Sequence, residues 1–520
     1  MKNKILILLI SFAFVSFDIN EISNIMISDS KKLDGNYIAT WFKNNGSFNR
    51  DPVTGNSGFE WPNGTNKHLT YASGLWIAGK VLSDTLVSIT NFVSENFPGY
   101  INADGVPAGK DDPDFRIYKI VKGDTTSADY MNWPVNQGAY LDSLNKPFLP
   151  GMQTLYFCMT DGYPESHDHS DPLKAQIQVT SWCYNSVTDP VISNTIFSEF
   201  KVINKNSIAW TDADISVWSD ECSGEYIAIG CDTSLNLGYS YYQPQSPQFG
   251  NIPPAHGFLL LQGPAKYTGN TIDTVYSFIP GKNKRRIRIG YKETGFSSFN
   301  MFINGSPYYK QPGNVKEFYN TVQGLFFNGN PWINPLTSNI TKFPYPGDPE
   351  SGAGWYQSAE LGYGNRRLLM NFGLLNFNPG DTQSIIVAQI VSQGTNNLNS
   401  VTKLKQNSVY IKNIFENNFT TVSVKDPDGI YQPENVLLKQ NFPNPFNPVT
   451  AINYELRNNE FVNLKIYDIN GKEIKTLVNG EQSVGKYTVR FDGNDLASGI
   501  YFYKLTAGNF SDTKKMILSK

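Results

Sequence analysis

Short runs of residues that alternate between apolar and polar constrain the fold of this chain most strongly. Such runs occur at Ala175–Trp182, Ile196–Ile203 and Ser384–Val391, and Gly, Asn, Asp and Pro residues bound them. Alternation with a period of two is typical of strands with one buried face. The 14% aromatic and 17% charged residues also suit a β-rich extracellular protein. We predict an all-β fold, in which a large β-sandwich body with long loops precedes a small Ig-like sandwich of about seven strands.

The body is assigned to residues 30–425 and contains one or two sandwiches. One helix is expected in it, at Leu398–Phe415, because apolar residues recur there on one side after a polar turn. Residues 240–256 and 304–356 are rich in Pro, Gly, Tyr and Asn, which predicts long surface loops. Such loops often carry binding sites, and simple decoration is the alternative. Turns are predicted at Asn45-Gly46, Asn304-Gly305 and Asn328-Gly329.

The first residues have the pattern of a secretory signal peptide. Lys2 and Lys4 precede an apolar run from Ile5 to Phe17, shorter than the roughly 20 residues of a membrane helix. We predict a signal peptide at residues 1–20 and export; a buried first strand or helix is the alternative. No other run approaches the length of a membrane helix, so no transmembrane segment is expected. The net charge of −3 gives no basic surface for nucleic acid.

Four cysteines, Cys158, Cys183, Cys222 and Cys231, lie in the middle third of the chain. Disulfides would be permitted after export, and Cys222 with Cys231 or Cys158 with Cys183 could each close a loop. Buried free thiols are the alternative, and the spacing does not choose between them.

The last eighty residues have the clearest pattern. A polar linker with two prolines, assigned to residues 426–436, precedes a tail at 437–520. The tail opens with a lead-in that cannot form a central strand, because each of its prolines lacks an N–H donor. Asn470-Gly471 then predicts a type I′ hairpin turn. The alternating runs that follow the lead-in are Ala451–Leu456, Val462–Tyr467, Tyr487–Asp492 and Ile500–Leu505.

Four parts of this tail resemble, in order, the type A C-terminal sorting domain of proteins exported by the type IX secretion system of Bacteroidetes and their relatives. They are FPNPFNP, IYDINGK, LASGIYFYKL and KKMILSK. The resemblance implies export, contact with the secretion machinery at the outer membrane, and release or surface attachment. An ordinary Ig-like module is the alternative. The matching motif residues are Phe442, Pro443, Asn444, Pro445, Phe446, Asn447, Pro448, Gly471, Gly499, Tyr501 and Lys515.

Three segments of the body are similar to an uncharacterised extracellular region that often precedes such tails. They are Glu60–Gly64, Ser73–Lys80 and Gly230–Thr233. This resemblance implies a location and no chemistry.

Two polar clusters have some metal-binding character. His167, Asp168 and His169 lie close to Asp171, but their flanks predict a loop and a zinc site would need a further ligand. A solvated polar loop is the alternative. The second cluster, Asp220, Glu221 and Asp232, offers hard carboxylates after a strand, which would suit calcium. Ordinary Asp-containing turns are the alternative there.

Two further features concern binding. Arg286 and Arg288 fall on one face of a predicted strand, which indicates either a charged, solvated edge or a site for a polyanion. Several Trp residues lie near Gly, Pro and Asn, where they would either stack on sugar rings or pack in the core. These residues are Trp61, Trp76, Trp133, Trp332 and Trp355.

The function predicted from these features is that of a secreted or surface-attached protein whose body is a non-enzymatic adhesion, surface-structural or glycan-binding module. The chain has four histidines, and no nucleophile elbow, zincin motif or phosphate-binding loop occurs in it. No catalytic or cofactor-binding residue is nominated, and calcium is the one cofactor considered. A secreted polysaccharide-degrading hydrolase is the alternative, and it would need a cleft with two facing carboxylates.

Overall fold

A computed structural model of the protein describes residues 28–419 and 436–520, apart from 222–223, 283, 457–459, 483–484 and 509. The chain forms two compact units that divide between Val424 and Lys425. Both consist mainly of antiparallel β-sheet, so the all-β prediction is confirmed. The predicted signal peptide and nearly all of the predicted linker lie outside the described residues. Within the described ranges, no helix has both the length and the apolarity that a membrane span requires.

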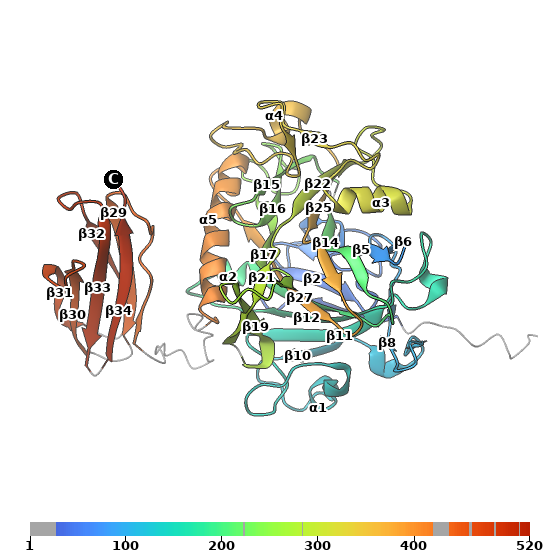
Figure 1. Ribbon diagram of the computed structural model, residues 1–520, viewed down its shortest axis with the longest axis horizontal. Helices are drawn as coiled ribbons and strands as arrows, with labels where there is room; N and C mark the ends of the chain where they lie inside the picture. Colours follow the sequence, from blue (N-terminus) through green and yellow to red (C-terminus); the bar gives the residue numbers. More distant parts are fainter. Residues whose placement is uncertain are drawn as a thin grey trace, which may run out of the picture. The chain divides into compact units, whose positions relative to one another are not determined.

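Two large sheets form the body, one of nine strands and one of six (Figure 1). The order in the first is β10 (Tyr118–Val121), β11 (Gln153–Thr160), β12 (Ala175–Cys183), β13 (Thr195–Asn204), β27 (Thr382–Ser392), β17 (Ala255–Gln262), β16 (Leu237–Tyr242) and β15 (Ile227–Asp232), with β7 (Phe97–Pro98) beside β11. The order in the second is β22 (Ser298–Ile303), β25 (Arg366–Asn371), β14 (Trp210–Asp220), β5 (Ala72–Val81) and β6 (Asp84–Ile89), with β26 (Leu375–Phe377) beside β14. A smaller sheet contains β1 (Ser30–Leu33), β2 (Ala39–Lys43), β3 (Phe59–Glu60) and β4 (His68–Thr70).

The main hydrophobic core lies between the two large sheets. Along β13, Phe200 and Val202 contribute to this core, whereas Phe197 belongs to a second core on the outer face of the nine-stranded sheet. Along β5, Leu75 faces the main core and Trp76 belongs to a cluster on the outer face of the six-stranded sheet. Successive side chains of a strand point to opposite faces, so the alternating sequence pattern specifies this sandwich directly.

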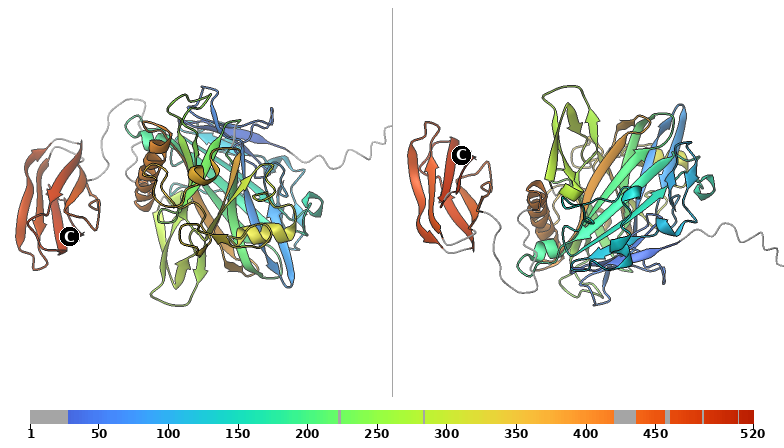
Figure 2. Two further views of the ribbon diagram at one scale, coloured as in Figure 1. Left: turned by 90° about the horizontal axis from the view of Figure 1, so that it is seen from above. Right: turned by 90° about the horizontal axis from the view of Figure 1, so that it is seen from below.

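Helices cover parts of both outer faces (Figures 1 and 2). The long helix α5 (Asn397–Glu416) packs its apolar side on β16, β17 and β27, which confirms the helix predicted at 398–415. The Asn396 side chain caps it by accepting hydrogen bonds from the first backbone N–H groups. A shorter helix, α3 (Val315–Val322), covers the six-stranded sheet.

A two-stranded hairpin projects on the outer face of the nine-stranded sheet beside α5 (Figure 2). It consists of β19 (Thr274–Ile279) and β20 (Lys284–Ile289), and β18 (Ala265–Tyr267) with β21 (Tyr291–Glu293) forms a second pair next to it. Next to its connecting turn, the rings of Phe278 and Phe415 of α5 lie 5.4 Å apart between centroids. Gln262 Oε1 also accepts a hydrogen bond of 2.6 Å from the Phe278 N–H. The turn end of the hairpin is therefore fixed to both the sheet and the helix.

The predicted loops are partly ordered into short elements. Residues 304–356 contain α3 and the short pair β23 (Trp332–Ile333) and β24 (Ile340–Thr341). The three predicted turns of the body have their glycines in the left-handed region, with φ of 90° at Gly46, 76° at Gly305 and 87° at Gly329.

The disulfide considered between Cys158 and Cys183 is not present, and the free-thiol alternative is confirmed for the described cysteines. Cys158, Cys183 and Cys231 are buried free thiols, and Cys222 lies outside the described residues. Although β11 and β12 are neighbours, Cys158 pairs with Gln178 and Cys183 with Gln153, so the register holds the two cysteines five residue pairs apart. Burial raises the pKa of the Cys158 and Cys183 thiols to about 12, which leaves them uncharged at neutral pH.

The tail is a sandwich of seven strands in two sheets, as predicted. One sheet has the order β28 (Leu437–Leu438), β29 (Val449–Leu456) and β32 (Gly485–Asp492). The other has the order β31 (Glu473–Gln482), β30 (Glu460–Tyr467), β33 (Gly499–Ala507) and β34 (Phe510–Leu518).

The hairpin predicted at Asn470-Gly471 is present between β30 and β31, but the prediction of a two-residue type I′ turn is wrong. The loop extends from Asp468 to Lys472, and Gly471 occupies the left-handed position with a φ of 78°. The Asp468 carboxylate accepts hydrogen bonds of 2.9 Å from the N–H groups of Asn470 and Lys472, which stabilises the longer loop.

Candidate functional site

A hollow of the body lies between the β19–β20 hairpin and the outer face of the nine-stranded sheet. We call it the hairpin cleft; its volume is about 640 Å³. Its floor includes Glu199 and Lys201 on β13 and Ser384 on β27, and its hairpin wall includes Arg286 and Arg288 on β20. Glu199 and Lys201 share this face because they are two positions apart, and Phe197 precedes them on it.

Glu199 is the carboxylate of the cleft floor and is only 2% exposed. Its Oε1 accepts a hydrogen bond of 2.6 Å from Ser384 Oγ and one of 3.3 Å from the Tyr140 hydroxyl. Burial raises the pKa of Glu199, and Lys201 and the two hydroxyl donors oppose that rise. The carboxylate is therefore satisfied by neutral hydroxyl groups from two other segments of the chain.

Lys201 has a different environment. Its ammonium lies 4.3 Å from the centroid of the Tyr140 ring. Among the described residues it has neither a hydrogen bond nor a carboxylate within 4.0 Å. Burial lowers the pKa of Lys201, and the Glu199 charge opposes this only in part. The cleft floor thus holds a partly desolvated cation with no ion-pair partner, which is unfavourable unless an anion reaches it.

The hairpin wall adds two more cations. Arg288 lies over the ring of Tyr291, with 3.8 Å between the guanidinium carbon and the ring centroid. No ion pair involves Arg286 or Arg288 within the described part of the chain. The predicted placement of these two arginines on one strand face is confirmed, since both positions lie in β20 and are two residues apart.

Sequence reasoning missed Glu199, Lys201 and Tyr140 as parts of a site. Two charges separated by two positions in the apolar strand Ile196–Ile203 were the available signal, because a strand buried on both faces rarely carries them. Tyr140 gave no signal, since it comes from a distant loop.

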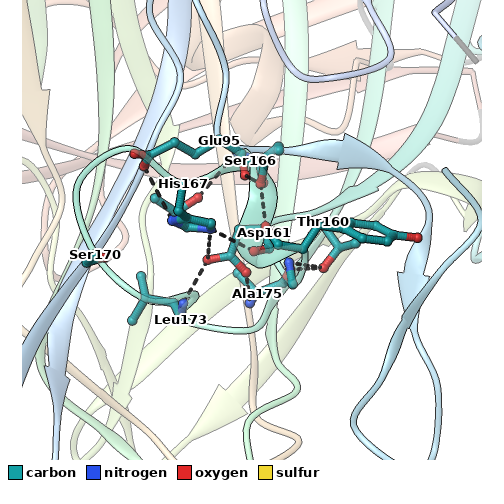
Figure 3. Close-up of polar contacts among 12 residues, drawn as sticks. Glu95, Thr160, Asp161, Ser166, His167, Ser170, Leu173 and Ala175 are labelled. Carbon is teal, nitrogen blue, oxygen red and sulfur yellow. Dashed lines mark hydrogen bonds and ion pairs between the residues drawn. The ribbon is translucent and has the colours of Figure 1, made fainter. Parts of the chain in front are cut away.

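The His167 cluster is a buried structural group (Figure 3). The His167 ring lies between Asp161 and Glu95, with 3.9 Å from Nε2 to Asp161 Oδ2 and 3.8 Å from Nδ1 to Glu95 Oε2. Nε2 also contacts the Asp161 carbonyl oxygen at 2.7 Å. Asp161 accepts hydrogen bonds from the N–H groups of Leu173 and Ala175. The cluster ties the 161–175 loop together.

His169 extends this cluster toward the surface. Its Nδ1 lies 2.6 Å from Glu95 Oε1, and its ring contacts Phe318 of α3. Burial raises the pKa of Asp161 to about 6, against the opposing effects of His167 and the two backbone donors. Throughout the described ranges, no group of three or more His, Cys, Asp or Glu residues has an arrangement that could hold a metal ion.

The three proposed calcium ligands contact different protein groups. Asp220 Oδ2 pairs with Arg367 Nε at 3.0 Å. Asp232, at the far end of β15, pairs with Lys405 of α5 at 3.3 Å. The structure does not bring Asp232 to the other two carboxylates, and calcium binding stays a prediction.

Glu221 belongs to a buried pair. Its Oε2 lies 2.8 Å from His256 Nδ1 and accepts a hydrogen bond of 2.8 Å from Ser240 Oγ. Burial opposes ionisation of Glu221, but His256 and the hydroxyl donors outweigh it and hold the pKa below its ordinary value. This pair is closed off from solvent, since both side chains are at most 1% exposed.

The five tryptophans considered for sugar stacking are all in the interior. Their exposed fractions do not exceed 8%, so the stacking hypothesis is wrong for them and the packing alternative is confirmed. Trp332 and Trp355 pack with Tyr345 inside the main core, and Trp133 donates its indole N–H to the Tyr140 carbonyl oxygen. Large apolar rings gain most from complete burial, and proximity to Gly and Pro in sequence does not alter that.

In the tail, the lead-in connects the two sheets. Phe446 is buried, and its backbone pairs with Ile517 and Ser519 at the end of β34. Asn444 Oδ1 accepts a further hydrogen bond of 2.8 Å from the Ile517 N–H. Phe442, in contrast, is 60% exposed. Pro443, Pro445, Asn447 and Pro448 complete this lead-in.

Three further motif residues, Gly499, Tyr501 and Lys515, lie in the neighbouring strands β33 and β34. Gly499 begins β33, and the buried Tyr501 donates its hydroxyl to the Ala497 carbonyl oxygen at 2.8 Å. Lys515 lies in β34, and its carbonyl oxygen accepts a hydrogen bond from Gln440.

The chain thus belongs to the class of proteins in which an all-β body precedes a separate β-sandwich tail. Residues 440–519 match the family described as the secretion system C-terminal sorting domain. The tail is therefore a type IX sorting domain, as the four motifs predicted, and the protein is secreted or displayed at the cell surface. The sorting domain also implies contact with the type IX secretion machinery.

No curated protein matches the chain. Among solved structures, a polysaccharide lyase is 7% identical, with 66% of this chain and 34% of that chain covered and a TM-score of 0.21. A β-1,2-glucanase from Parabacteroides distasonis is 9% identical, with 68% and 38% covered and a TM-score of 0.13. A dimeric latent PorU from Porphyromonas gingivalis is 9% identical, with 70% and 31% covered and a TM-score of 0.15. The chain thus spans about a third of the length of each, and scores this low support no functional argument.

Proposed function

We propose that the body is a non-enzymatic glycan-binding module, and that the hairpin cleft is its binding site. The observation that carries this proposal is an open hollow of about 640 Å³ whose floor lies on two central strands of the nine-stranded sheet. Sites on such rigid elements keep their shape without a ligand. The hollow has the volume of a small-ligand site, which suits one or two sugar rings, and glycans surround any protein exported to the cell surface.

The cleft does not resemble the site of a glycoside hydrolase. Such enzymes need two carboxyl groups that flank the scissile bond. Among the described residues that line the cleft, Glu199 is the one carboxylate. Two hydroxyl groups donate hydrogen bonds to its Oε1. Binding without bond cleavage therefore fits the cleft better.

A hydrolase would more readily use a smaller hollow on the other side of the hairpin. This hollow has a volume of about 430 Å³ and contains both Asp273 and Glu293. Burial raises the pKa of Glu293, as a general acid requires. Asp273 accepts a hydrogen bond from the Thr268 hydroxyl. This pair makes the hydrolase a second candidate function.

The test uses the exported protein against a panel of polysaccharides, with binding and release of reducing sugar measured together. Ser277→Trp should fill the cleft and weaken binding, whereas Tyr276→Trp places the same side chain on the side of the smaller hollow. Binding that Ser277→Trp abolishes and Tyr276→Trp preserves would support the proposal. Release of reducing sugar that is lost in Glu293→Gln would replace it with the hydrolase.

A further inference from the structure

We infer that the ligand of the hairpin cleft is an acidic glycan, one that carries carboxylate or sulfate groups at intervals along its chain. This inference rests on the proposed function and names the class of glycan. Its basis is an excess of positive charge in the cleft, where Lys201, Arg286 and Arg288 face one carboxylate, Glu199.

The inference depends first on how Glu199 is satisfied. Ser384 Oγ at 2.6 Å and the Tyr140 hydroxyl at 3.3 Å hydrogen-bond to its Oε1. Lys201 is not within ion-pair distance of it, so the Glu199 charge offsets the desolvation of the ammonium only in part. Burial lowers the pKa of Lys201, which indicates that the charge is held at a cost in the unliganded protein. An anionic group that contacts the ammonium would remove this cost.

The two arginines supply a second position for negative charge. Arg286 and Arg288 are spaced by two residues on β20, and both line the cleft wall, opposite the floor that holds Lys201. Guanidinium groups bind carboxylate and sulfate in a bidentate manner, whereas an ammonium acts as a point charge. A polymer with charges on successive sugars could place one anionic group against Lys201 on the floor and another against the arginines on the wall. A glycan with a single charged end could contact only one of these two positions.

A neutral glycan would leave these three cations without partners in the bound state. Closing the cleft over a ligand removes water from the ammonium and the guanidinium groups, and neutral hydroxyls replace that water poorly. The cleft therefore selects against uncharged sugars as well as for charged ones.

The experiment measures binding of the full exported protein to polygalacturonate, dextran sulfate and uncharged dextran. Both acidic polymers test the shared anionic chemistry, and their order of affinity distinguishes carboxylate from sulfate. We expect binding to at least one acidic polymer, weakened progressively by salt, and at least tenfold weaker binding to dextran.

Variants assign this binding to the cleft. Lys201→Gln and the double variant Arg286→Gln/Arg288→Gln should each weaken acidic-polymer binding about tenfold. Lys266→Gln removes a charge from the exposed strand β18, outside the cleft, and should leave the affinity within about twofold. Lys201→Gln should also leave the melting temperature unchanged or raised, because it removes an unpaired, partly buried charge.

The outcomes separate the two proposals. Equal or tighter binding to dextran that Ser277→Trp abolishes would overturn the acidic-glycan inference and keep glycan binding. Equal loss in Lys201→Gln and Lys266→Gln would also overturn the inference, since it would reflect general charge. No binding to any polysaccharide, or binding only to phosphatidylglycerol vesicles, would overturn both.

Discussion

Asp214 gives the sharpest test of the buried electrostatics of the body. It lies in β14, is 1% exposed, and burial raises its pKa from 3.8 to about 8. The folded protein therefore holds the proton at neutral pH, whereas the unfolded chain releases it. Because the folded pKa is the higher one, stability is greatest below about pH 4 for this group and is lost as the pH rises toward 8.

The magnitude follows from the shift. Each pH unit between the two pKa values is worth about 1.4 kcal/mol, so at pH 7 the group costs about 4 kcal/mol relative to a neutral side chain. Asp214→Asn supplies that neutral side chain. Ser216 Oγ and the Phe372 N–H both donate to the same oxygen, Oδ1, at 3.0 and 3.1 Å. An amide carbonyl can keep both of these hydrogen bonds.

The assay is urea unfolding of the wild type and Asp214→Asn at pH 4.5, 5.5, 6.5 and 7.5. All nine tryptophans lie between Trp41 and Trp355, so tryptophan fluorescence reports the unfolding of the body alone. We expect the advantage of Asp214→Asn to grow by about 1.4 kcal/mol per pH unit. Asp212→Asn is the matched control on the same strand, where the carboxylate is 52% exposed and pairs with Lys80. It should shift stability by less than about 1 kcal/mol. Parallel pH curves for the wild type and Asp214→Asn would refute the argument.

Three further predictions use the same protein. Deletion of residues 437–520 should leave a folded body in the periplasm, and finding the truncated protein in the medium would contradict the sorting assignment. His256→Ala should cost about 3 kcal/mol in urea unfolding, because it leaves the Glu221 carboxylate buried without its imidazole partner. Adding Glu221→Gln to that variant should recover part of the loss; equal stability of the single and double variants would show that the unpaired carboxylate is not its cause. If Asp220, Glu221 and Asp232 hold calcium, a chelator should lower the melting temperature of the body, and an unchanged value would end that hypothesis.

The sequence predicted those parts of the fold that depend on local patterns. The helix predicted at 398–415 follows from an apolar side and a preceding polar turn, both of which lie within one segment. The tail follows from consecutive strands and a proline-rich lead-in. The sequence left disulfides and free thiols open, and the β11–β12 register, which spacing does not reveal, holds Cys158 and Cys183 apart.

The cleft could not be predicted in the same way, because its residues meet only through long-range pairing. Antiparallel pairing of β13 with β27 sets Lys201 directly opposite Ser384, although 183 positions separate them in the chain. Tyr140 arrives from a loop before β11, and Arg286 from a hairpin inserted between β17 and β22. Each segment contributes one or two polar residues, so no run of sequence has the composition of a binding site.

The same topology explains why the cleft cations can remain unpaired without unfolding the protein. β13 is hydrogen-bonded to β12 on one side and to β27 on the other, over nine residue pairs each. These ladders and the main core on the opposite face fix the position of Lys201, whatever its own interactions contribute. A sheet this extensive can therefore hold a desolvated charge in place for a ligand. The short β19–β20 hairpin, anchored mainly at Phe278, is the wall that a ligand would be expected to order further.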